Sequence, residues 1–166
     1  SDGKKVASGS YDRTVRIFDA EKGDVVRTIG RHKSKVNCVA WSPDGSRLAS
    51  AGDDNNVIIW KVKVEGDPKK LKGHTLPVNS IEWSPNGKWI ASGSKDKTII
   101  FWDVEKAKSL IVLKGHKGGV NGVSWNPEGT RIASAGEQNE IKVWDVSTGK
   151  EHAHFFKFNI YNWVSG

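Results

Sequence analysis

Histidine, serine and aspartate are the residue types of a hydrolytic triad, and this chain of 166 residues carries them in sets. The sets are His32, Ser50 and Asp54, followed by His74, Ser92 and Asp96. Each set precedes a tryptophan, Trp60 or Trp102. A catalytic triad occurs once in a domain, whereas these sets recur with the repeat of the sequence. We therefore interpret them as structural groups and predict that the protein is not an enzyme.

Other chemical signals in the sequence are sparse. His152-x-His154 has metal-ligand spacing but no third ligand, so we interpret it as the surface of an outer strand. The sequence has no phosphate-cradling glycine motif, no paired cysteines and no Gly-x-Ser-x-Gly elbow. We expect no metal and no cofactor. The single cysteine, Cys38, favours a reducing compartment.

The tryptophans define a repeat that has neither insertions nor deletions. Two series with a spacing of 42 residues are Trp60, Trp102, Trp144 and His32, His74, His116. One period before Trp60 stands Phe18, so the chain holds four units. A fixed period of this length is typical of solenoids and propellers. A grafted catalytic loop would break the period, and no unit contains one.

One unit, residues 31–72, shows what each repeat builds. Three apolar or alternating runs, 36–41, 47–51 and 57–60, are separated by the turn residues Pro43-Asp44-Gly45 and by residues 52–56, and a weaker run ends near Leu71. Short runs rich in β-branched residues and bounded by Gly, Pro, Asn and Asp indicate strands. No ten-residue segment keeps a helical period. Four strands per unit predict an all-β fold of propeller blades, each with four antiparallel strands.

Segments of the third unit resemble the WD-repeat signature in order and spacing. They are Gly73-His74, Ser84-Pro85-Asn86-Gly87, Ile90-Ala91-Ser92-Gly93-Ser94-Lys95-Asp96 and Trp102-Asp103. The resemblance recurs over nearly the whole chain. It implies a propeller in which a histidine, a serine, a turn aspartate and a tryptophan form a hydrogen-bonded tetrad in each blade. Such a network satisfies polar groups that would be costly to bury alone.

The resemblance assigns the tetrad residues by position. They are His32, Ser50, Asp54 and Trp60, then His74, Ser92, Asp96 and Trp102, and in the fourth unit His116, Ser134 and Trp144. The fourth unit has Gln138 where the resemblance expects aspartate. The first unit has Ser8 and Asp12 but Phe18 in place of tryptophan. Asp12 is still expected to point into its blade, as Asp54 and Asp96 do.

We predict one propeller section over residues 1–166. Blade one comprises residues 1–29 with 159–166, blade two 30–72, blade three 73–114 and blade four 115–158. Residues 160–165 repeat the pattern of residues 35–40, so this C-terminal strand is expected to complete the N-terminal blade. Propellers of this type usually have about seven blades. Three arrangements therefore remain: an excerpt of a larger propeller, two copies closing an eight-bladed ring, and a closed four-bladed monomer.

The net charge of +7 is concentrated on one predicted face. In such a propeller the connections from outer to inner strands and the turns between the middle strands share that face. We call it the cationic face and define it by Arg13, Arg31, Lys33, Lys35, Lys72, Lys95, Lys97 and Lys117. Glu137 and Glu140 are expected among the turn charges that offset it. The opposite face mixes both signs.

These patterns predict a non-catalytic, intracellular scaffold that presents the cationic face to acidic or phosphorylated protein segments. Cytoplasm and nucleus are not distinguished. The alternative is an architectural or engineered half-propeller that self-assembles into an eight-bladed ring as a homo-oligomer. Nucleic-acid binding is a weaker third reading, because aromatic residues hardly interleave with the basic ones. No apolar run of the sequence has the length of a membrane span.

Overall fold

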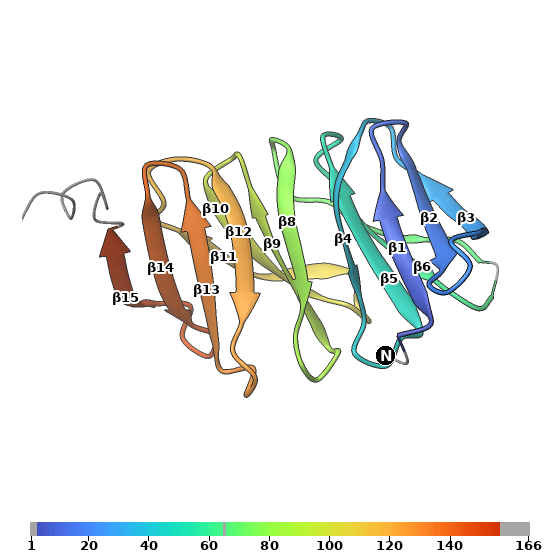
Figure 1. The fold of residues 1–166 in the computed structure, drawn as a ribbon. Helices are drawn as coiled ribbons and strands as arrows, with labels where there is room; N and C mark the ends of the chain where they lie inside the picture. The colour runs from blue at the N-terminus through green and yellow to red at the C-terminus, as the bar shows by residue number, and fades with distance from the viewer. Residues whose placement is uncertain (1–2, 65, 157–166) are drawn as a thin grey trace, which may run out of the picture.

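The computed structural model of the protein describes residues 3–64 and 66–156, and every regular element in them is a β-strand (Figure 1). The first sheet contains β1 (Lys5–Gly9), β2 (Thr14–Asp19) and β3 (Val25–Arg31). The second contains β4 (Val36–Trp41), β5 (Arg47–Gly52), β6 (Val57–Lys61) and β7 (Lys69–Leu71). The third contains β8 (Val78–Trp83), β9 (Trp89–Ser94), β10 (Thr98–Asp103) and β11 (Lys108–Lys114). The fourth contains β12 (Val120–Trp125), β13 (Arg131–Gly136), β14 (Glu140–Asp145) and β15 (Glu151–Phe156).

Within each sheet, strands that follow one another along the chain pair in antiparallel fashion. The predicted all-β architecture of four blades is therefore confirmed. The first sheet has three strands among the described residues. The predicted fourth strand of that blade falls in residues 159–166, which lie outside the described part of the chain.

The turn between the first two strands of a blade is closed by its own side chains. The Ser42 hydroxyl oxygen accepts a hydrogen bond from the Arg47 backbone N–H at 2.9 Å, and Ser84 accepts one from Trp89 at 2.9 Å. Gly45 has a φ of 67°, a left-handed conformation that costs glycine little. The repeated turn sequence therefore sets the hairpin between the inner strands.

Apolar clusters between consecutive sheets form the core. Ala49, Val57 and Leu71 of the second sheet are fully buried against Val78 and neighbouring residues of the third. Equivalent clusters lie between the first and second sheets and between the third and fourth. The fold is thus a row of sheets stacked face to face.

Two kinds of hydrogen bond tie adjacent blades together. The Trp83 indole N–H donates to the Ala40 carbonyl at 3.0 Å, and Trp125 donates to Glu82 at 3.4 Å. In the other direction, the Asn37 side-chain amide donates to the Val78 carbonyl at 3.0 Å, and Asn79 makes the same bond to Val120. These bonds join the inner strands of blades two, three and four, β4, β8 and β12, to one another.

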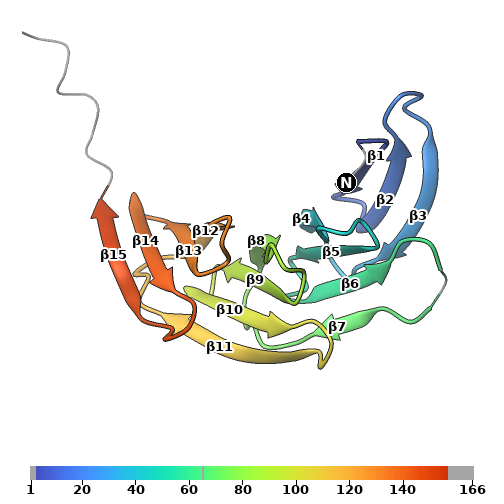
Figure 2. The ribbon, with the colours of Figure 1, turned by 90° about the horizontal axis from the view of Figure 1, so that it is seen from below.

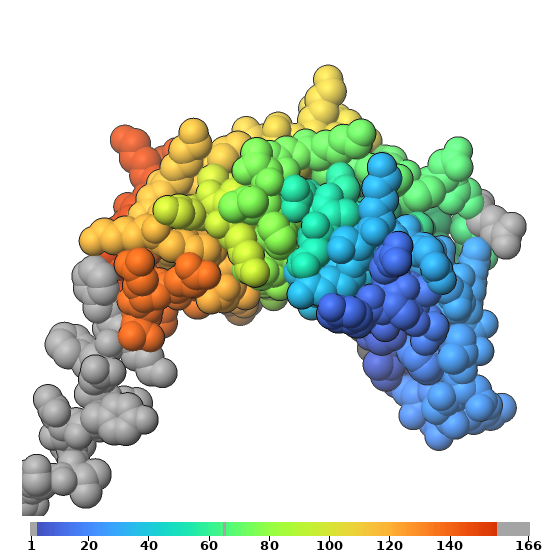
Figure 3. All heavy atoms as spheres, turned by 90° about the horizontal axis from the view of Figure 1, so that it is seen from above, coloured from blue at the N-terminus to red at the C-terminus, as the bar shows by residue number. Residues whose placement is uncertain are grey.

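The stacked sheets form an open arc, with the first strand of each sheet on the concave side (Figures 2 and 3). The first sheet, β1–β3, and the last sheet, β12–β15, lie at opposite ends of this arc. Over the described residues the arc does not close, so a closed four-bladed monomer is not observed. Wedge-shaped blades of this size would need much sharper packing to close a ring of four.

Candidate functional site

Four predicted residues of the second blade meet in one buried chain of hydrogen bonds. The Trp60 indole N–H donates to the Ser50 hydroxyl oxygen at 2.7 Å. Ser50 lies 2.7 Å from Nε2 of His32, whose Nδ1 lies 3.0 Å from the Asp54 carboxylate. The side chain of His32 is fully buried and that of Asp54 is nearly so.

The third blade repeats this geometry and fixes its protonation. Trp102 donates to Ser92 at 2.7 Å, Ser92 lies 2.7 Å from Nε2 of His74, and Nδ1 of His74 lies 2.8 Å from Asp96. A charged carboxylate can only accept, so Nδ1 of the neutral ring carries the proton and donates it to Asp96. Nε2 is then the acceptor, and the Ser92 hydroxyl donates to it while accepting from the Trp102 indole N–H. The imidazole is neutral, and burial lowers the pKa of His74 although Asp96 opposes that shift.

Hydrogen bonds keep the tetrad aspartates charged. Burial by itself raises the pKa of Asp96, but hydrogen bonds from the Thr98 hydroxyl, His74 and the Thr75 backbone outweigh it, and the pKa is lowered. The pKa of Asp54 is lowered in the same way, by His32 and the Lys33 backbone N–H against the effect of burial. Each carboxylate therefore remains a charged acceptor in a mostly buried position.

The fourth blade completes its network with a residue that the sequence analysis assigned elsewhere. Nδ1 of His116 lies 2.8 Å from Glu140, while Ser134 lies 2.7 Å from Nε2 and 2.8 Å from the donating Trp144 indole. Glu140 is 2 % exposed, so its placement among the surface turn charges was wrong. The longer glutamate reaches the histidine from the first position of β14, whereas Gln138 is exposed in the turn.

The sequence contains an indication that Glu140 takes the role of the tetrad aspartate in blade four. Glu140 occupies the place of Asn56 and Thr98 in the preceding units, at the entry to an otherwise apolar strand. Lys142 is 4 % exposed and stands where blades two and three have Ile58 and Ile100, and its Nζ lies 3.5 Å from Glu140. Two charged residues in a strand that is largely apolar in those two blades indicate a buried ion pair.

The two histidines of β15, His152 and His154, lie in different environments. Nε2 of His154 lies 3.1 Å from Oε1 of Glu140, an oxygen that lacks a well-angled hydrogen bond, whereas His152 is exposed. Within the described residues, no group of three or more His, Cys, Asp or Glu side chains is arranged to hold a metal ion.

Asp12 of the first blade does not point into a tetrad, so that expectation was wrong. Its side chain is 45 % exposed and accepts hydrogen bonds from the Thr14 backbone at 2.9 Å and from Arg16 at 2.7 Å. The bonds from Thr14 lower the pKa of Asp12 to about 2. No histidine stands beside Asp12 in the described part of the chain, and without that partner the carboxylate turns to solvent.

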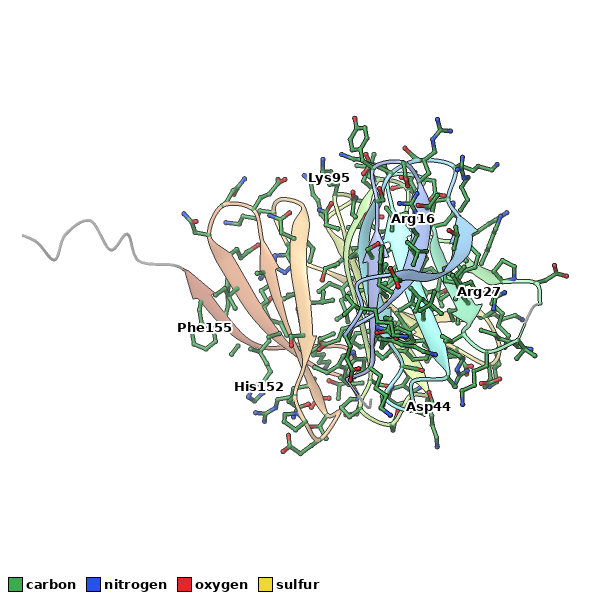
Figure 4. The ribbon with its side chains drawn as sticks, turned by 45° about the vertical axis from the view of Figure 1, so that its right-hand side comes forward. Arg16, Arg27, Asp44, Lys95, His152 and Phe155 are labelled. Atoms are coloured by element: carbon green, nitrogen blue, oxygen red, sulfur yellow. The ribbon has the colours of Figure 1, made fainter. Side chains whose placement is uncertain are left out.

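Each buried carboxylate also fixes the connection that carries part of the cationic face. The Lys33 backbone N–H donates to Asp54 at 3.0 Å, Thr75 donates to Asp96 at 3.0 Å, and Lys117 donates to Glu140 at 3.2 Å. These bonds hold the chain just after each tetrad histidine. Lys95 and Asp44 lie at opposite ends of the sheets, which separates the cationic face from the inner hairpin turns (Figure 4).

Half of the cationic face gathers around one hollow of about 820 Å³ between blades one and two. The residues that line it are Tyr11, Asp12, Arg13, Arg31, Lys33, Ser34, Lys35 and Asp53. Nζ of Lys35 lies 3.3 Å from Asp53 and 5.7 Å from the centre of the Tyr11 ring, and that ring is mostly exposed. The hollow thus joins four cations to two carboxylates and an open aromatic ring.

The remaining members of the cationic face lie apart from this hollow. A smaller cavity of about 100 Å³ is lined by Arg31, Lys33, Lys70 and Lys72, beside His32 of the second tetrad. Lys95, Lys97 and Lys117 line neither cavity. The structure therefore brings together basic residues of blades one and two, whereas those of blades three and four line neither of these two cavities.

Arg13 and Lys97 hold unusual backbone conformations. Their φ angles are 75° and 71°, at positions where the other units place Asn55 and Asn139. Asparagine adopts the left-handed region more readily than a long side chain does. Two of the four turns thus carry a basic residue where the backbone favours asparagine.

Comparison with known proteins agrees with this architecture. The family model described as the CAF1B/HIR1 beta-propeller domain matches residues 1–165. The F-box-like/WD repeat-containing protein TBL1X of Mus musculus is 46 % identical over 39 residues, which are 24 % of this chain and 7 % of that protein. The F-box-like/WD repeat-containing protein TBL1Y of Homo sapiens is 46 % identical over 39 residues, which are 24 % of this chain and 8 % of that protein. The WD-repeat resemblance is confirmed.

The chain matches less than a tenth of the length of these relatives. Among residues 3–64 and 66–156, no helix has the length and apolar character needed to cross a membrane.

Replacing Asp96 with alanine should lower the free energy of unfolding by about 2–4 kcal/mol, because the buried His74 loses its acceptor. Asp12→Ala is the matched control, since Asp12 makes the same turn contacts to Thr14 that Asp96 makes to Thr98 but has no histidine partner. Urea unfolding of both variants measures the difference. Equal losses would contradict a stabilising role of the histidine contact.

Stability should fall as the pH is lowered from about 7.5 to about 5. Burial holds the pKa of His74 and His116 below 6.5, so the unfolded chain binds more protons in this range. The contribution of the neutral histidines is complete above the unfolded-state pKa and is lost as the pH falls. Asp54 and Asp96 have pKa values lowered from 3.8, so their contribution to stability is lost only at lower pH than this range.

Thermal melting across this pH range tests the expectation. The exposed His152→Asn variant should show the same decline as the unchanged chain. A melting temperature that stays level would show that the tetrad histidines are not held neutral by burial.

Proposed function

Since the chain belongs to the CAF1B/HIR1 beta-propeller domain family, we propose that it is a non-catalytic scaffold whose cationic face holds acidic or phosphorylated segments of partner proteins. WD-repeat β-propellers are typically protein-interaction scaffolds. The observation that carries the proposal is the hollow between blades one and two, where Arg13, Arg31, Lys33 and Lys35 converge.

The chemistry of the hollow suits phosphate and carboxylate groups. Guanidinium groups bind such anions with two parallel hydrogen bonds, and the hollow offers Arg13 and Arg31. Arg31 and Lys33 also line the smaller cavity, so an extended segment can contact both cavities in sequence. The exposed Tyr11 ring adds an apolar surface for a neighbouring side chain.

The buried tetrads support the non-catalytic part of the proposal. Ser50, Ser92 and Ser134 are at most 2 % exposed, and each accepts from a tryptophan while facing a histidine. A nucleophile must reach its substrate, and these hydroxyl groups lie inside the blades. Their polar groups are used to hold the connections that carry the cationic face.

A second candidate function is architectural, namely self-assembly into a larger ring. The observation that favours it is the apolar surface left exposed at the end of the arc, where Ile141 is 41 % and Phe155 is 55 % exposed. Nucleic-acid binding is a weaker reading, because Tyr11 is the one aromatic residue that lines the two hollows. An intracellular location is part of the proposal and rests on the single free cysteine, Cys38.

The triple variant Arg13→Asn, Arg31→Gln and Lys33→Gln should bind an acidic peptide at least about tenfold more weakly at low salt, with little change in melting temperature. Asparagine suits the left-handed backbone at position 13, and all three side chains are exposed. Fluorescence anisotropy with a peptide of alternating glutamate and phosphoserine measures the affinity. The difference should shrink as salt screens the exposed charges.

Lys22→Gln, Lys88→Gln and Lys150→Gln provide the control, because they remove the same charge from exposed positions in the opposite turns. If both triple variants weaken binding alike, net charge explains the effect and the proposed site fails. Tighter binding of single-stranded DNA than of the peptide, lost in the first variant alone, would favour nucleic acid as the partner.

A further inference from the structure

The smaller cavity beside the second tetrad has a larger excess of positive charge than the hollow. Four basic residues line its volume of about 100 Å³, namely Arg31 at the end of β3, Lys33 in the following connection, and Lys70 and Lys72 at β7. Asp54 is the one carboxylate among the described residues that line it. The hollow, by contrast, has two carboxylates beside its four cations. The cavity lies toward the convex side of the arc, where β7 is the outermost strand of its sheet (Figure 2).

The carboxylate of Asp54 is already engaged by the tetrad and the backbone. Its Oδ1 lies 3.0 Å from Nδ1 of His32 and accepts the Asn56 backbone N–H at 3.2 Å. Its Oδ2 accepts the Lys33 backbone N–H at 3.0 Å. The charged groups of the four basic side chains form no hydrogen bond or ion pair within residues 3–64 and 66–156. Four positive charges therefore line this cavity without an acidic partner from the described chain.

These basic residues depart from an otherwise regular repeat. One period later the same four places hold Gly73, Thr75, Val112 and Lys114, so blade three has a single cation there. A requirement of the blade itself recurs with the period, as the tetrad residues do. The cluster around the smaller cavity does not recur, so the fold alone does not explain it.

The fourth blade shows what a basic residue in this place contacts. His154 is paired with β14 as Lys70 is paired with β6, so the two residues occupy equivalent places in their sheets. Nε2 of His154 lies 3.1 Å from Oε1 of the buried Glu140. Nζ of Lys142 lies 3.5 Å from the same oxygen. Blade four therefore supplies a carboxylate of its own chain to the basic residues at this place.

The second blade has the basic residue without the carboxylate. Asn56 stands two periods before Glu140. Its side-chain amide is neutral and donates a hydrogen bond to the Asp54 carbonyl at 2.6 Å. Lys70 therefore meets no acidic side chain where His154 meets one. An anion from outside the chain can fill the place that Glu140 fills in blade four.

The size and charge of the smaller cavity favour a phosphate group over a carboxylate. Its volume of about 100 Å³ has room for about three waters, so one small terminal group enters and the backbone of a bound segment stays outside. A phosphorylated side chain carries a charge of about −1.5 to −2 and three acceptor oxygens, whereas a carboxylate carries one charge and two oxygens. Because four cations surround the group, the one with more charge and more oxygens gains more. Arg31 can also give phosphate two parallel hydrogen bonds.

We propose that the smaller cavity binds one phosphorylated serine or threonine side chain of a partner segment and makes the cationic face selective for phosphate over carboxylate. This inference rests on the proposed function, because the same segment continues into the hollow. Arg31 and Lys33 line both cavities, so residues beside the phosphorylated side chain meet the hollow. The smaller cavity recognises the modification, and the hollow adds a general attraction for acidic residues.

Fluorescence anisotropy with two peptides of otherwise identical sequence tests the selectivity. One peptide carries a single phosphoserine among glutamates, and the other carries glutamate in its place. The unchanged protein should bind the phosphorylated peptide at least about fivefold more tightly. Lys70→Gln with Lys72→Gln should weaken binding of the phosphorylated peptide more than binding of the glutamate peptide, and so remove most of this preference.

Lys108→Gln with Lys114→Gln is the matched control. Both lysines are exposed on β11, the outer strand of blade three, and Lys114 stands one period after Lys72. This variant removes the same charge outside the smaller cavity and should keep the preference for phosphoserine. Both double variants should keep the melting temperature of the unchanged protein, because all four side chains are exposed.

The possible contrary results overturn different claims. Equal affinity of the unchanged protein for the two peptides overturns the phosphate site and leaves the proposed function standing. A preference that survives in the Lys70 and Lys72 variant overturns the site as well. Loss of the preference in both double variants assigns it to net charge and also overturns the site. Binding of neither peptide overturns the proposed function and the phosphate site with it.

Asn56→Glu tests the site by filling it from within the chain. This variant gives blade two the carboxylate that Glu140 supplies in blade four, and the new side chain should contact Lys70. Asn56→Gln has the same length without the charge, so the comparison of the two isolates the effect of the carboxylate. Asn56→Glu should bind the phosphorylated peptide at least about fivefold more weakly than Asn56→Gln. Equal binding by the two variants, with the circular dichroism spectrum of the folded protein, would mean that the phosphate binds elsewhere.

Discussion

The hydrogen bond between a buried imidazole and a buried carboxylate is the interaction on which the other features of each blade depend. The imidazole turns its second nitrogen to a serine, which a tryptophan indole holds in place. The carboxylate also accepts the backbone N–H that follows the histidine. One network therefore joins the inner connection, the second strand and the third strand. Removing any member leaves a polar group buried without a partner, which costs more than the bond itself contributes.

Blade four shows that the histidine requires a carboxylate beside its Nδ1 and that this carboxylate can come from a different residue. Glu140 reaches His116 from a strand, where the other blades use an aspartate from a turn. This solution buries a second carboxylate oxygen, which blade four surrounds with Lys142 and His154. Burial raises the pKa of Glu140, but the bonds from the Lys117 backbone and His116 outweigh it and lower the pKa. Blade four therefore places a lysine of β14 and a histidine of β15 beside the buried glutamate.

Residues that recur at the same position of each repeat could be predicted from the sequence. Residues whose role depends on a contact with another strand or another blade could not. The resemblance to the WD-repeat signature assigns Ser92, and the period carries the assignment to Ser50 and Ser134, because equal steps along the chain return to equal places in each sheet. Glu140 escaped prediction because its longer side chain meets His116 from another strand. Asp12 escaped because its role depends on a histidine rather than on its own turn. The hollow at Arg13 and Lys33 depends on how two blades approach, and no pattern within one unit contains that information.

The cationic face depends on the tetrads without using their side chains. Lys33 and Lys117 donate their backbone N–H groups to the buried carboxylates of Asp54 and Glu140, while their side chains are exposed. A change of either side chain therefore alters the charge of the face and leaves the hydrogen bonds of the blade in place. Each connection thus carries two separate constraints, because the fold holds its backbone and only its outward side chains set the charge that a partner meets.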